Sequence, residues 1–251
     1  MSDSLYPPPP PPVGSYIPPS SPPPPPPPSP MPGGSFDFAR CLTFVFEDPD
    51  WIKKILIGGL MYLATFVIVG AFFLMGYVAR LARNVIEGSQ RPLPEWDDLG
   101  EYFSEGLKLF AITLIYSLPL VLLACAVMVP VAIAGNMGNR HSQDLAGGVV
   151  SCVWCLMVPI FLAMALWIPA ALLRAIATRE FRAAFEFGPI AAFIRANIGN
   201  YLLAIVVHLV ANFISQFGVV LLCVGIIFTA FWSVCVSAYA FAQTYRLAAA
   251  R

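Results

Sequence analysis

Residues 201–245 read YLLAIVVHLVANFISQFGVVLLCVGIIFTAFWSVCVSAYAFAQTY, and these 45 residues contain no Asp, Glu, Lys or Arg. A single helix of this length would be about 68 Å long, more than twice the ~30 Å hydrocarbon core of a bilayer. The stretch must therefore fold back on itself. Cys223-Val224-Gly225 divides it into two halves, and glycine eases a turn. The sequence predicts a tight hairpin of two spanning helices, 201–222 and 226–245.

The composition of the whole chain is that of a membrane protein. Of its 251 residues, 59% are hydrophobic and 11% are charged, and 14 Lys+Arg balance 14 Asp+Glu. Soluble domains carry about 25% charged residues, and a chain without net charge has no field that attracts a polyanion. The composition therefore argues against a soluble enzyme and against a nucleic-acid-binding protein.

Three further stretches without charge lie at 55–79, 109–134 and 145–173. About 20 apolar residues span a bilayer, so the last two each predict one spanning helix. We expect an all-α fold, a polytopic transmembrane helical bundle with four full spans and a first segment that spans or re-enters. Interfacial amphipathic helices are expected beside these spans, and the membrane domain is expected to cover 35–251.

The stretch at 55–79 has two interpretations. It crosses the membrane once, or it dips in and returns as a re-entrant hairpin of two shorter helices. The re-entrant arrangement places 13 Lys+Arg on one side and only Arg140 on the other, whereas a full crossing gives 10 and 4. Because positive charge is retained in the cytoplasm, this distribution favours the re-entrant hairpin and cytoplasmic N- and C-termini. In the middle of the stretch only Gly70 is available to break the helix.

A short sequence pattern occurs twice. Phe36-Asp37-Phe38 starts 15 residues before Trp51, and Phe185-Glu186-Phe187 starts 16 residues before Tyr201. Each unit predicts an interfacial amphipathic helix, a turn, an aromatic anchor and insertion into the membrane. The alternative is chance similarity between segments drawn from a small apolar alphabet.

The N-terminal segment 1–34 has a different composition, because 17 of the 25 prolines lie within residues 1–32. Proline fixes φ and lacks a donor, so the segment favours polyproline II. It has neither the basic region nor the apolar region of a secretory signal. We expect a disordered cytoplasmic tail. Tyr6-Pro7-Pro8 and Tyr16-Ile17-Pro18-Pro19 are candidate docking motifs for a protein partner, and a plain spacer is the alternative.

Residues 46–60 read FEDPDWIKKILIGGL, residues 77–98 read YVARLARNVIEGSQRPLPEWDD, and residues 99–108 read LGEYFSEGLK. Together they resemble the bacterial and archaeal membrane family called domain of unknown function 4013. The motif residues that carry the resemblance are Asp48, Pro49, Asp50, Trp51, Glu87, Gly88, Pro94, Glu95, Trp96, Asp97 and Asp98. The family has no established activity, so the resemblance implies a location and a fold rather than a chemistry. The chain departs from the family at Asn197-Ile198-Gly199-Asn200, where an NPGDY-like sequence is expected.

An acidic cluster follows Pro94 and comprises Glu95, Asp97, Asp98, Glu101 and Glu105. Asp97 or Asp98 is placed to cap a helix that begins near Leu99. Glu101 and Glu105 are expected on a solvated face of that helix, and a cation or polyamine site is the alternative.

Cys152-Val153-Trp154-Cys155 has the spacing of a redox or zinc motif but lies inside an apolar stretch. A zinc site needs four ligands and a redox pair needs a different fold, so we interpret these thiols as small buried hydrophobes.

His208, Asn212 and Ser215 fall at helical spacing and form one polar stripe within a predicted span. Ionisable residues inside a membrane are functional candidates. A proton relay or substrate pathway would need partners on other helices, and the candidates are Thr229, Ser233, Ser237, Tyr116 and Ser117. The alternative is a neutral histidine that forms an interhelical hydrogen bond.

No nucleotide-binding, hydrolase or zinc-protease motif occurs in the sequence, and we expect no catalytic residue, cofactor or metal. The first hypothesis is a non-enzymatic scaffold or organising protein of the cell (cytoplasmic) membrane. Its expected partners are the lipid bilayer, a protein bound by the Pro-rich tail and further copies of the chain, but not nucleic acid. The alternative is a small transporter or channel with His208 and Asn212 beside its pathway.

Overall fold

The computed structural model describes residues 35–137, 140–220 and 225–250, which are largely helical and contain no strand. The predictions for the Pro-rich segment 1–34, and for Cys223 and Val224 in the last hairpin, lie outside the described residues. Five helical segments are long and apolar enough to cross a membrane: Val69–Glu87, Leu99–Ile133, Gly147–Thr178, Ile198–Val220 and Gly225–Ala249. The predicted all-α multi-pass membrane fold is confirmed.

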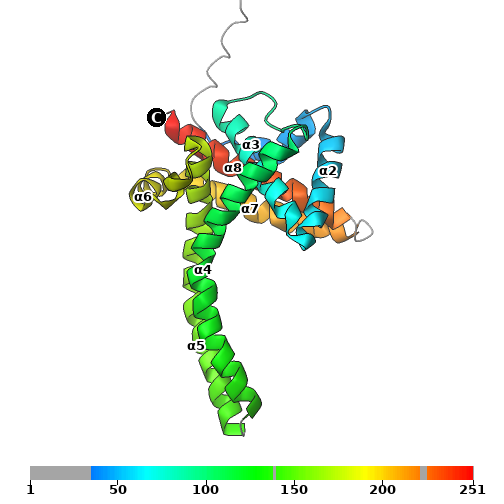
Figure 1. Cartoon of the computed structure of the whole chain (residues 1–251). Coiled ribbons are helices and arrows are strands. Elements are labelled where there is room, and N and C mark those ends of the chain that lie inside the picture. The colour runs from blue at the N-terminus through cyan, green and yellow to red at the C-terminus, as the bar shows by residue number, and fades with distance from the viewer. Residues whose placement is uncertain (1–34, 138–139, 221–224, 251) are drawn as a thin grey trace, which may run out of the picture. The chain divides into compact units, whose positions relative to one another are not determined.

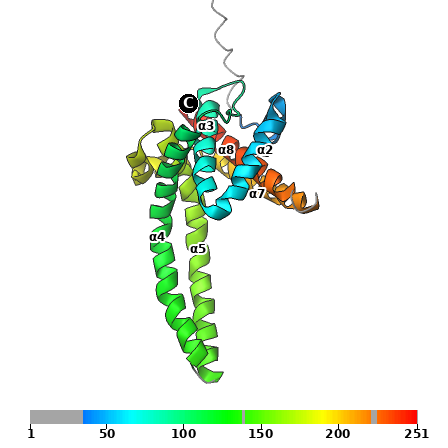
Figure 2. The same ribbon diagram turned by 45° about the vertical axis from the view of Figure 1, so that its right-hand side comes forward.

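The helices form three hairpins in chain order (Figures 1 and 2). In sequence the elements are α1 (Phe38–Thr43), η1 (Phe44–Glu47), α2 (Trp51–Leu63), η2 (Ala64–Val67), α3 (Val69–Glu87), α4 (Leu99–Met137), α5 (Arg140–Thr178), η3 (Phe181–Phe185), α6 (Phe187–Ala196), α7 (Ile198–Gln216), η4 (Phe217–Val220) and α8 (Gly225–Ala249). The hairpins are α2/α3, α4/α5 and α7/α8, and each pairs two helices that are neighbours in the sequence.

The stretch 201–245 folds back as predicted. α7 and α8 pack along each other, and η4 lies between them in the sequence. Near the turn the Thr229 hydroxyl donates to the carbonyl oxygen of Ser215 at 2.8 Å. Gly218 is buried here, and a Cβ atom on it would overlap the Thr229 hydroxyl. The absence of a side chain at Gly218 therefore allows the two helices to approach closely.

The stretch 55–79 also reverses direction, so a single straight helix over these residues is wrong. The chain leaves α2, passes through η2 and begins α3 after Ile68, whose φ of 66° is unusual for a β-branched residue. Gly70 lies just after the turn, where a Cβ atom would overlap the carbonyl oxygen of Met61. The break falls before Gly70, and this glycine lets α3 start close against the end of α2. This hairpin is the local geometry that the re-entrant alternative requires.

The middle hairpin contains the longest helices. α4 and α5 each have 39 residues and lie side by side (Figure 2). Each continues through two prolines, which are Pro119, Pro130, Pro159 and Pro169. Many of their large apolar side chains are exposed, as expected for helices whose solvent is lipid.

The backbones of α3 and α4 touch at two glycines. A Cβ atom on Gly76 would overlap the carbonyl oxygen of Tyr102, and a Cβ atom on Gly106 would overlap that of Phe72. Small residues that allow such close approach are typical of helix pairs in membranes. At these two glycines the backbones of α3 and α4 are therefore in direct contact.

The repeated sequence pattern produces a similar order of elements twice. A short helix, a longer helix, a 3-10 turn and a second long helix occur as α1–α2–η2–α3 and as α6–α7–η4–α8, but η1 lies between α1 and α2 and has no counterpart between α6 and α7. The two hairpins pack together through α8, which contacts both α2 and α3. Details differ, because Asp37 caps α1 by accepting from the Arg40 amide at 2.9 Å, whereas Glu186 pairs with Arg174 at 3.0 Å. Tyr201 is fully buried and donates to the Leu166 carbonyl oxygen at 2.6 Å, so it does not present an anchor to lipid.

Candidate functional site

The predicted polar stripe lies on α7 and faces α8. The Nδ1 atom of His208 is 2.7 Å from the Ser237 hydroxyl, so Ser237 is the partner that the structure selects among the predicted candidates. Asn212 donates to the carbonyl oxygen of His208 at 2.8 Å, and the Ser215 hydroxyl donates to the carbonyl oxygen of Asn212, also at 2.8 Å. The stripe is therefore partly used in hydrogen bonds within α7 and across to α8.

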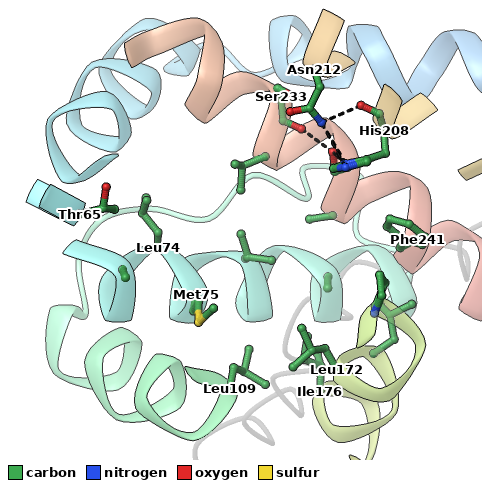
Figure 3. Close-up of a pocket in the computed structure, with 18 residues that line it drawn as sticks. Thr65, Leu74, Met75, Leu109, Leu172, Ile176, His208, Asn212, Ser233 and Phe241 are labelled. Carbon is green, nitrogen blue, oxygen red and sulfur yellow. Dashed lines mark hydrogen bonds between the residues drawn. The ribbon is translucent and has the colours of Figure 1, made fainter. Parts of the chain in front are cut away.

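Of the other candidate partners, two lie near the stripe and two do not. Ser233 lines the same cavity as His208 (Figure 3). Thr229 bonds to the carbonyl oxygen of Ser215. Tyr116 lies elsewhere, because its hydroxyl donates to the Ala184 carbonyl oxygen at 2.6 Å and accepts from the Trp167 indole at 3.2 Å. Ser117 donates to the carbonyl oxygen of Leu114 within its own helix. The hydrogen bonds of Tyr116 and Ser117 do not reach the stripe, so the structure does not support these two candidate partners.

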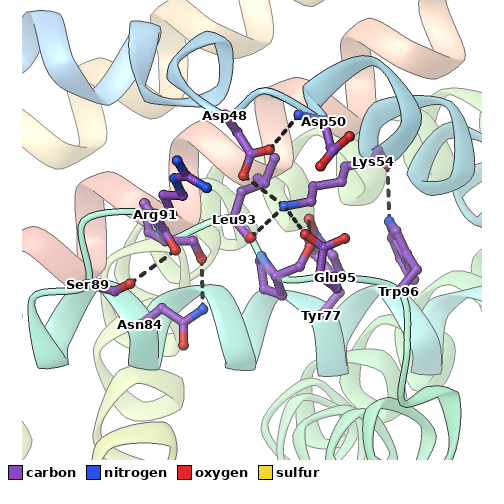
Figure 4. Close-up of polar contacts among 12 residues, drawn as sticks. Asp48, Asp50, Lys54, Tyr77, Asn84, Ser89, Arg91, Leu93, Glu95 and Trp96 are labelled. Atoms are coloured by element: carbon purple, nitrogen blue, oxygen red, sulfur yellow. Dashed lines mark hydrogen bonds and ion pairs between the residues drawn. The ribbon is translucent and has the colours of Figure 1, made fainter.

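A second polar site gathers the family-like motif residues at the start of α2 (Figure 4). The Nζ atom of Lys54 is 2.7 Å from Asp48 Oδ2 and 2.6 Å from Glu95 Oε1, and it donates to the Leu93 carbonyl oxygen at 3.1 Å. Lys54 is only 3% exposed and Asp48 only 5%. A buried charge is costly unless it is paired, and here Lys54 has two carboxylate partners.

The Asp48-Pro49-Asp50 sequence explains this geometry locally. Asp48 Oδ1 accepts from the Asp50 amide at 2.9 Å, which forms an Asx-turn at the start of α2. Its other oxygen, Oδ2, is left to bind Lys54 one turn into the helix. One carboxylate therefore shapes the turn and neutralises the lysine.

The connection between α3 and α4 closes over the same site. Gly88 ends α3 in the left-handed conformation with a φ of 82°. Trp96 stacks on Tyr77 with ring centroids 4.3 Å apart, and its indole donates to the Lys54 carbonyl oxygen at 3.1 Å. The Tyr77 hydroxyl donates to the Pro94 carbonyl oxygen at 3.1 Å. The motif segments at 46–60 and 77–98 therefore come together around Lys54.

The acidic cluster is used differently from the prediction. Asp98 caps α4 as expected, because its Oδ1 accepts from the Glu101 amide at 2.9 Å. Glu101 and Glu105 are not simply solvated, since they form ion pairs with Arg80 and Arg83 of α3. Sequence reasoning treated the arginines and the glutamates separately and missed both pairs. Arg80 and Arg83 are three residues apart, and Glu101 and Glu105 are four apart, so each pair lies on one face of its helix. This spacing could have indicated that the basic face of α3 packs against the acidic face of α4.

Charged residues of both signs line a cavity beside Lys54. The cavity has a volume of about 300 Å³ and is lined by Asp48, Asp50, Lys54, Arg80, Arg91 and Asp97 among others, whereas the exposed motif residue Glu87 does not line it. Both signs of charge meet in this cavity. Burial acts to lower the pKa of Lys54, but hydrogen bonds and charges from Asp48 and Glu95 outweigh it and raise the pKa above its ordinary value. Lys54 is therefore held as a cation.

The cysteine motif is not buried. Cys152 and Cys155 are exposed on α5, in contrast to the prediction of buried thiols, whereas Cys41 and Cys235 are buried. Within the described part of the chain, no group of three His, Cys, Asp or Glu side chains could hold a metal ion.

Comparison with protein families matches residues 58–224 to a family described as protein of unknown function, DUF4013. This is the family that the sequence motifs resemble, and the matched range contains the 77–98 segment that closes over Lys54. No curated protein and no solved structure matches the chain.

Proposed function

The chain belongs to DUF4013, a family of proteins of unknown function, and we propose that it is a non-enzymatic scaffold of the cell membrane. The observation that carries this proposal is that the ion pairs connect different elements of the fold. Lys54 joins Asp48 to Glu95, and two arginines of α3 pair with two glutamates of α4. Charges used in this way fix how the hairpins sit against one another, and a fixed framework is what a scaffold requires.

The proposed location is the cytoplasmic membrane, with both termini in the cytoplasm. The reversal of the chain between α2 and α3 supports this orientation, because a re-entrant segment requires such a reversal. α2 has 13 residues, which gives a length of about 20 Å, shorter than the ~30 Å hydrocarbon core. A re-entrant first hairpin is the arrangement that keeps 13 of the 14 Lys+Arg on one side.

Thiol labelling of intact cells tests this orientation. Single cysteines are placed at Ser2, Ser35, Ser89 and Ser142 in a cysteine-free background and treated with a membrane-impermeant reagent. We expect only the Ser142 variant to react, and lysed cells provide the control for reactivity of the other three. Reaction of the Ser2 and Ser35 variants in intact cells would mean that the first hairpin crosses the membrane and that residues 1–34 face outward.

The proposed partner of the scaffold is a protein that binds the Pro-rich segment 1–34. A proximity-labelling enzyme fused to the C-terminus would compare the full chain with a variant in which 1–34 is replaced by an equally long Gly/Ser segment. We expect a defined set of proteins to be labelled at least about 5-fold less in the variant. Equal labelling by both chains would contradict the proposal. Self-association, the other proposed interaction, is tested by the mass of the purified particle.

A second candidate function is transport, and the contact between His208 and Ser237 favours it. An ionisable side chain that bridges two membrane helices beside a cavity is the arrangement from which proton-coupled pathways are built. The two functions are distinguished by measuring flux across the membrane: a transporter carries a substrate across, and a scaffold does not.

A further inference from the structure

The α7/α8 hairpin exposes apolar side chains from its base to its tip. Val206, Leu209, Phe213 and Val220 are between 45% and 82% exposed. The stretch 201–245 contains no Asp, Glu, Lys or Arg, so this surface lacks the polar rim of a protein interface that borders water. An apolar surface of this extent needs a cover, and lipid acyl chains fit it. The position of the hairpin along the membrane normal decides which leaflet supplies them.

The α4/α5 hairpin gives the direction of the membrane normal. The charge-free stretch 109–134 of α4 is about 39 Å long, enough to cross the ~30 Å hydrocarbon core. Between 117 and 131 the half-buried side chains of α4 recur every three or four positions, as on a helix with one neighbour, and that neighbour is α5. This part of the pair therefore lies alone in lipid, with the charged first turns of α4 at one end and Met137 at the other.

The base of the α7/α8 hairpin lies beside the middle of α4 and α5. Tyr201, in the first turn of α7, donates to the carbonyl oxygen of Leu166 in α5 at 2.6 Å. The next residue of α5, Trp167, donates its indole hydrogen to the Tyr116 hydroxyl of α4 at 3.2 Å. The base of the hairpin is therefore at about the level of Tyr116.

The tip of the same hairpin lies toward the charged end of α4. Phe231, in the second turn of α8, packs on Tyr77 and Trp96, with ring centroids 5.5 and 6.0 Å away. Trp96 belongs to the charged connection that precedes α4, and its indole bonds to the Lys54 carbonyl oxygen. A hairpin that crossed the membrane from the level of Tyr116 would carry Phe231 toward the far end of α4 instead. Figures 1 and 2 show α7/α8 lying across the α4/α5 pair rather than along it.

The tip of the α2/α3 hairpin lies toward the same end of α4. Phe72, close to this tip, packs on Phe103 and Phe110 of α4, with ring centroids 5.4 and 5.0 Å away. Phe110 is the second residue of the charge-free stretch, so the tip of α2/α3 reaches only the start of that stretch. Phe66 and Val67 at the tip are 85% and 73% exposed. Both hairpins therefore present exposed apolar tips at the end of α4 that carries the charges.

We propose that α7/α8 is a second re-entrant hairpin, and that the acyl chains of a single leaflet cover the exposed apolar surfaces of both α2/α3 and α7/α8. Among the described helices, only α4 and α5 then cross the membrane. α7 and α8 are long enough to cross, but a crossing is incompatible with Tyr201 beside Leu166 and Phe231 beside Trp96. The hairpin returns to its own side in either arrangement, so the distribution of Lys and Arg is unchanged. This inference goes beyond scaffolding, and it uses the proposed orientation only to identify the leaflet as the cytoplasmic one.

Depth measurements on the full chain in nanodiscs test the proposal. Single cysteines replace Val206, Phe213 and Val220 in a cysteine-free background, and each carries a bimane label. The quenching lipids carry a nitroxide at a shallow or a deep position of the acyl chain, so the ratio of quenching gives the distance of each label from the bilayer centre. The three side chains are exposed, so the substitutions leave the core intact.

The matched control is a helix that crosses the membrane. Leu114, Val121 and Met128 of α4 are exposed and have the same seven-residue spacing, which is about 10 Å along a helix. We expect the distances of the α4 labels from the bilayer centre to spread over about 10 Å or more, and those of the α7 labels over less than about 5 Å. A spread on α7 as large as that on α4 would overturn the proposal. So would α7 labels that no quenching lipid reaches, because a second copy of the chain would then cover α7.

Thiol labelling of intact cells gives an independent result. We expect Val220→Cys to react with a membrane-impermeant reagent at least about 10-fold less than Ser142→Cys, because a re-entrant tip does not reach the outer surface. Equal reaction of the two variants would show that α7 crosses the membrane and would overturn the proposal. Reaction of the Ser2 and Ser35 variants in place of Ser142 would overturn the proposed orientation alone, since the depth measurement does not depend on it.

Discussion

The indole nitrogen of Trp96 donates a hydrogen bond of 3.1 Å to the main-chain carbonyl oxygen of Lys54, which lies 42 positions earlier in the chain. This bond connects the loop before α4 to the first turn of α2. The acceptor is a main-chain atom, so the bond depends on the position of the α2 backbone and not on the side chain at position 54. Trp96 therefore links the first hairpin to the connection between α3 and α4.

Replacing Trp96 by Phe keeps an aromatic ring next to Tyr77 but removes the donor. We expect a loss of about 1 kcal/mol in the free energy of unfolding, the typical net value of one hydrogen bond. Thermal unfolding of the purified protein in detergent measures it. Trp154→Phe is the matched control, because Trp154 is 59% exposed on α5, and it should leave the melting temperature unchanged. Equal effects of the two substitutions would show that the bond to Lys54 contributes nothing.

Replacing Lys54 by Met removes the cation that neutralises buried Asp48. Because the carboxylate then lacks its partner, we expect a loss of about 3–5 kcal/mol. Lys53→Met is the control on the neighbouring exposed residue and should change stability by less than about 0.5 kcal/mol. The double variant Lys54→Met with Asp48→Asn should recover much of the loss, since no charge is left at position 48 and the side-chain oxygen can still accept from the Asp50 amide. A double variant that is as unstable as Lys54→Met alone would contradict this account of the pair.

The same lysine predicts a pH dependence at high pH. Its pKa in the folded chain lies above the ordinary value of 10.5, so folding favours the protonated form. The stabilisation is fully present below pH 10.5 and is lost as the pH rises through the higher folded pKa. The difference in melting temperature between wild type and Lys54→Met should therefore stay constant from about pH 8 to pH 10 and shrink only above that range. A difference that already falls near pH 9 would mean that the lysine loses its proton more easily than in water.

Gly106→Ala should separate α3 from α4, because the added Cβ atom would overlap the carbonyl oxygen of Phe72. We expect destabilisation of at least about 1–3 kcal/mol, as for overpacking in a core. Gly100→Ala on the same helix is the control, since its Cβ atom meets only Asp98 Oδ1 at 3.7 Å. Alanine has the higher helix propensity, so Gly100→Ala should be neutral or slightly stabilising. Thermal unfolding of both variants compares them, and equal stability would show that the two backbones do not touch.

Transport predicts a distinct result at His208. Replacing His208 by Ala should abolish pH-dependent flux into proteoliposomes if this side chain relays protons, whereas Asn212→Ala should reduce it less because Asn212 does not titrate. Unchanged flux in His208→Ala would remove the transport hypothesis. The scaffold proposal expects no flux above that of empty liposomes from either the wild type or the variants.

Length predicted the reversal within 201–245, and the distribution of Lys and Arg favoured a reversal within 55–79 over a single crossing. The stretch 201–245 is too long for one span, and the Lys+Arg distribution favoured a returning first segment although no proline marks the turn. The position of that turn could not be predicted, because it falls at Ile68, whose φ is 66°, and a β-branched residue is not one that sequence patterns associate with a turn. The same holds for Glu101 and Glu105. Their arginine partners depend on the register of α3 against α4, which the glycine contacts set and which no single segment contains.

The hairpin organisation has a consequence for how the chain reaches the membrane. In each of the three pairs the second helix begins soon after the first one ends: α3 follows α2 after η2, α5 begins at Arg140 after α4 ends at Met137, and α8 begins at Gly225 after η4 ends at Val220. Helices joined so closely can leave the ribosome and insert as a pair, with only a short connection between them. Biogenesis then needs no translocation of a folded segment, and each hairpin can bury its own backbone hydrogen bonds before the next one is made.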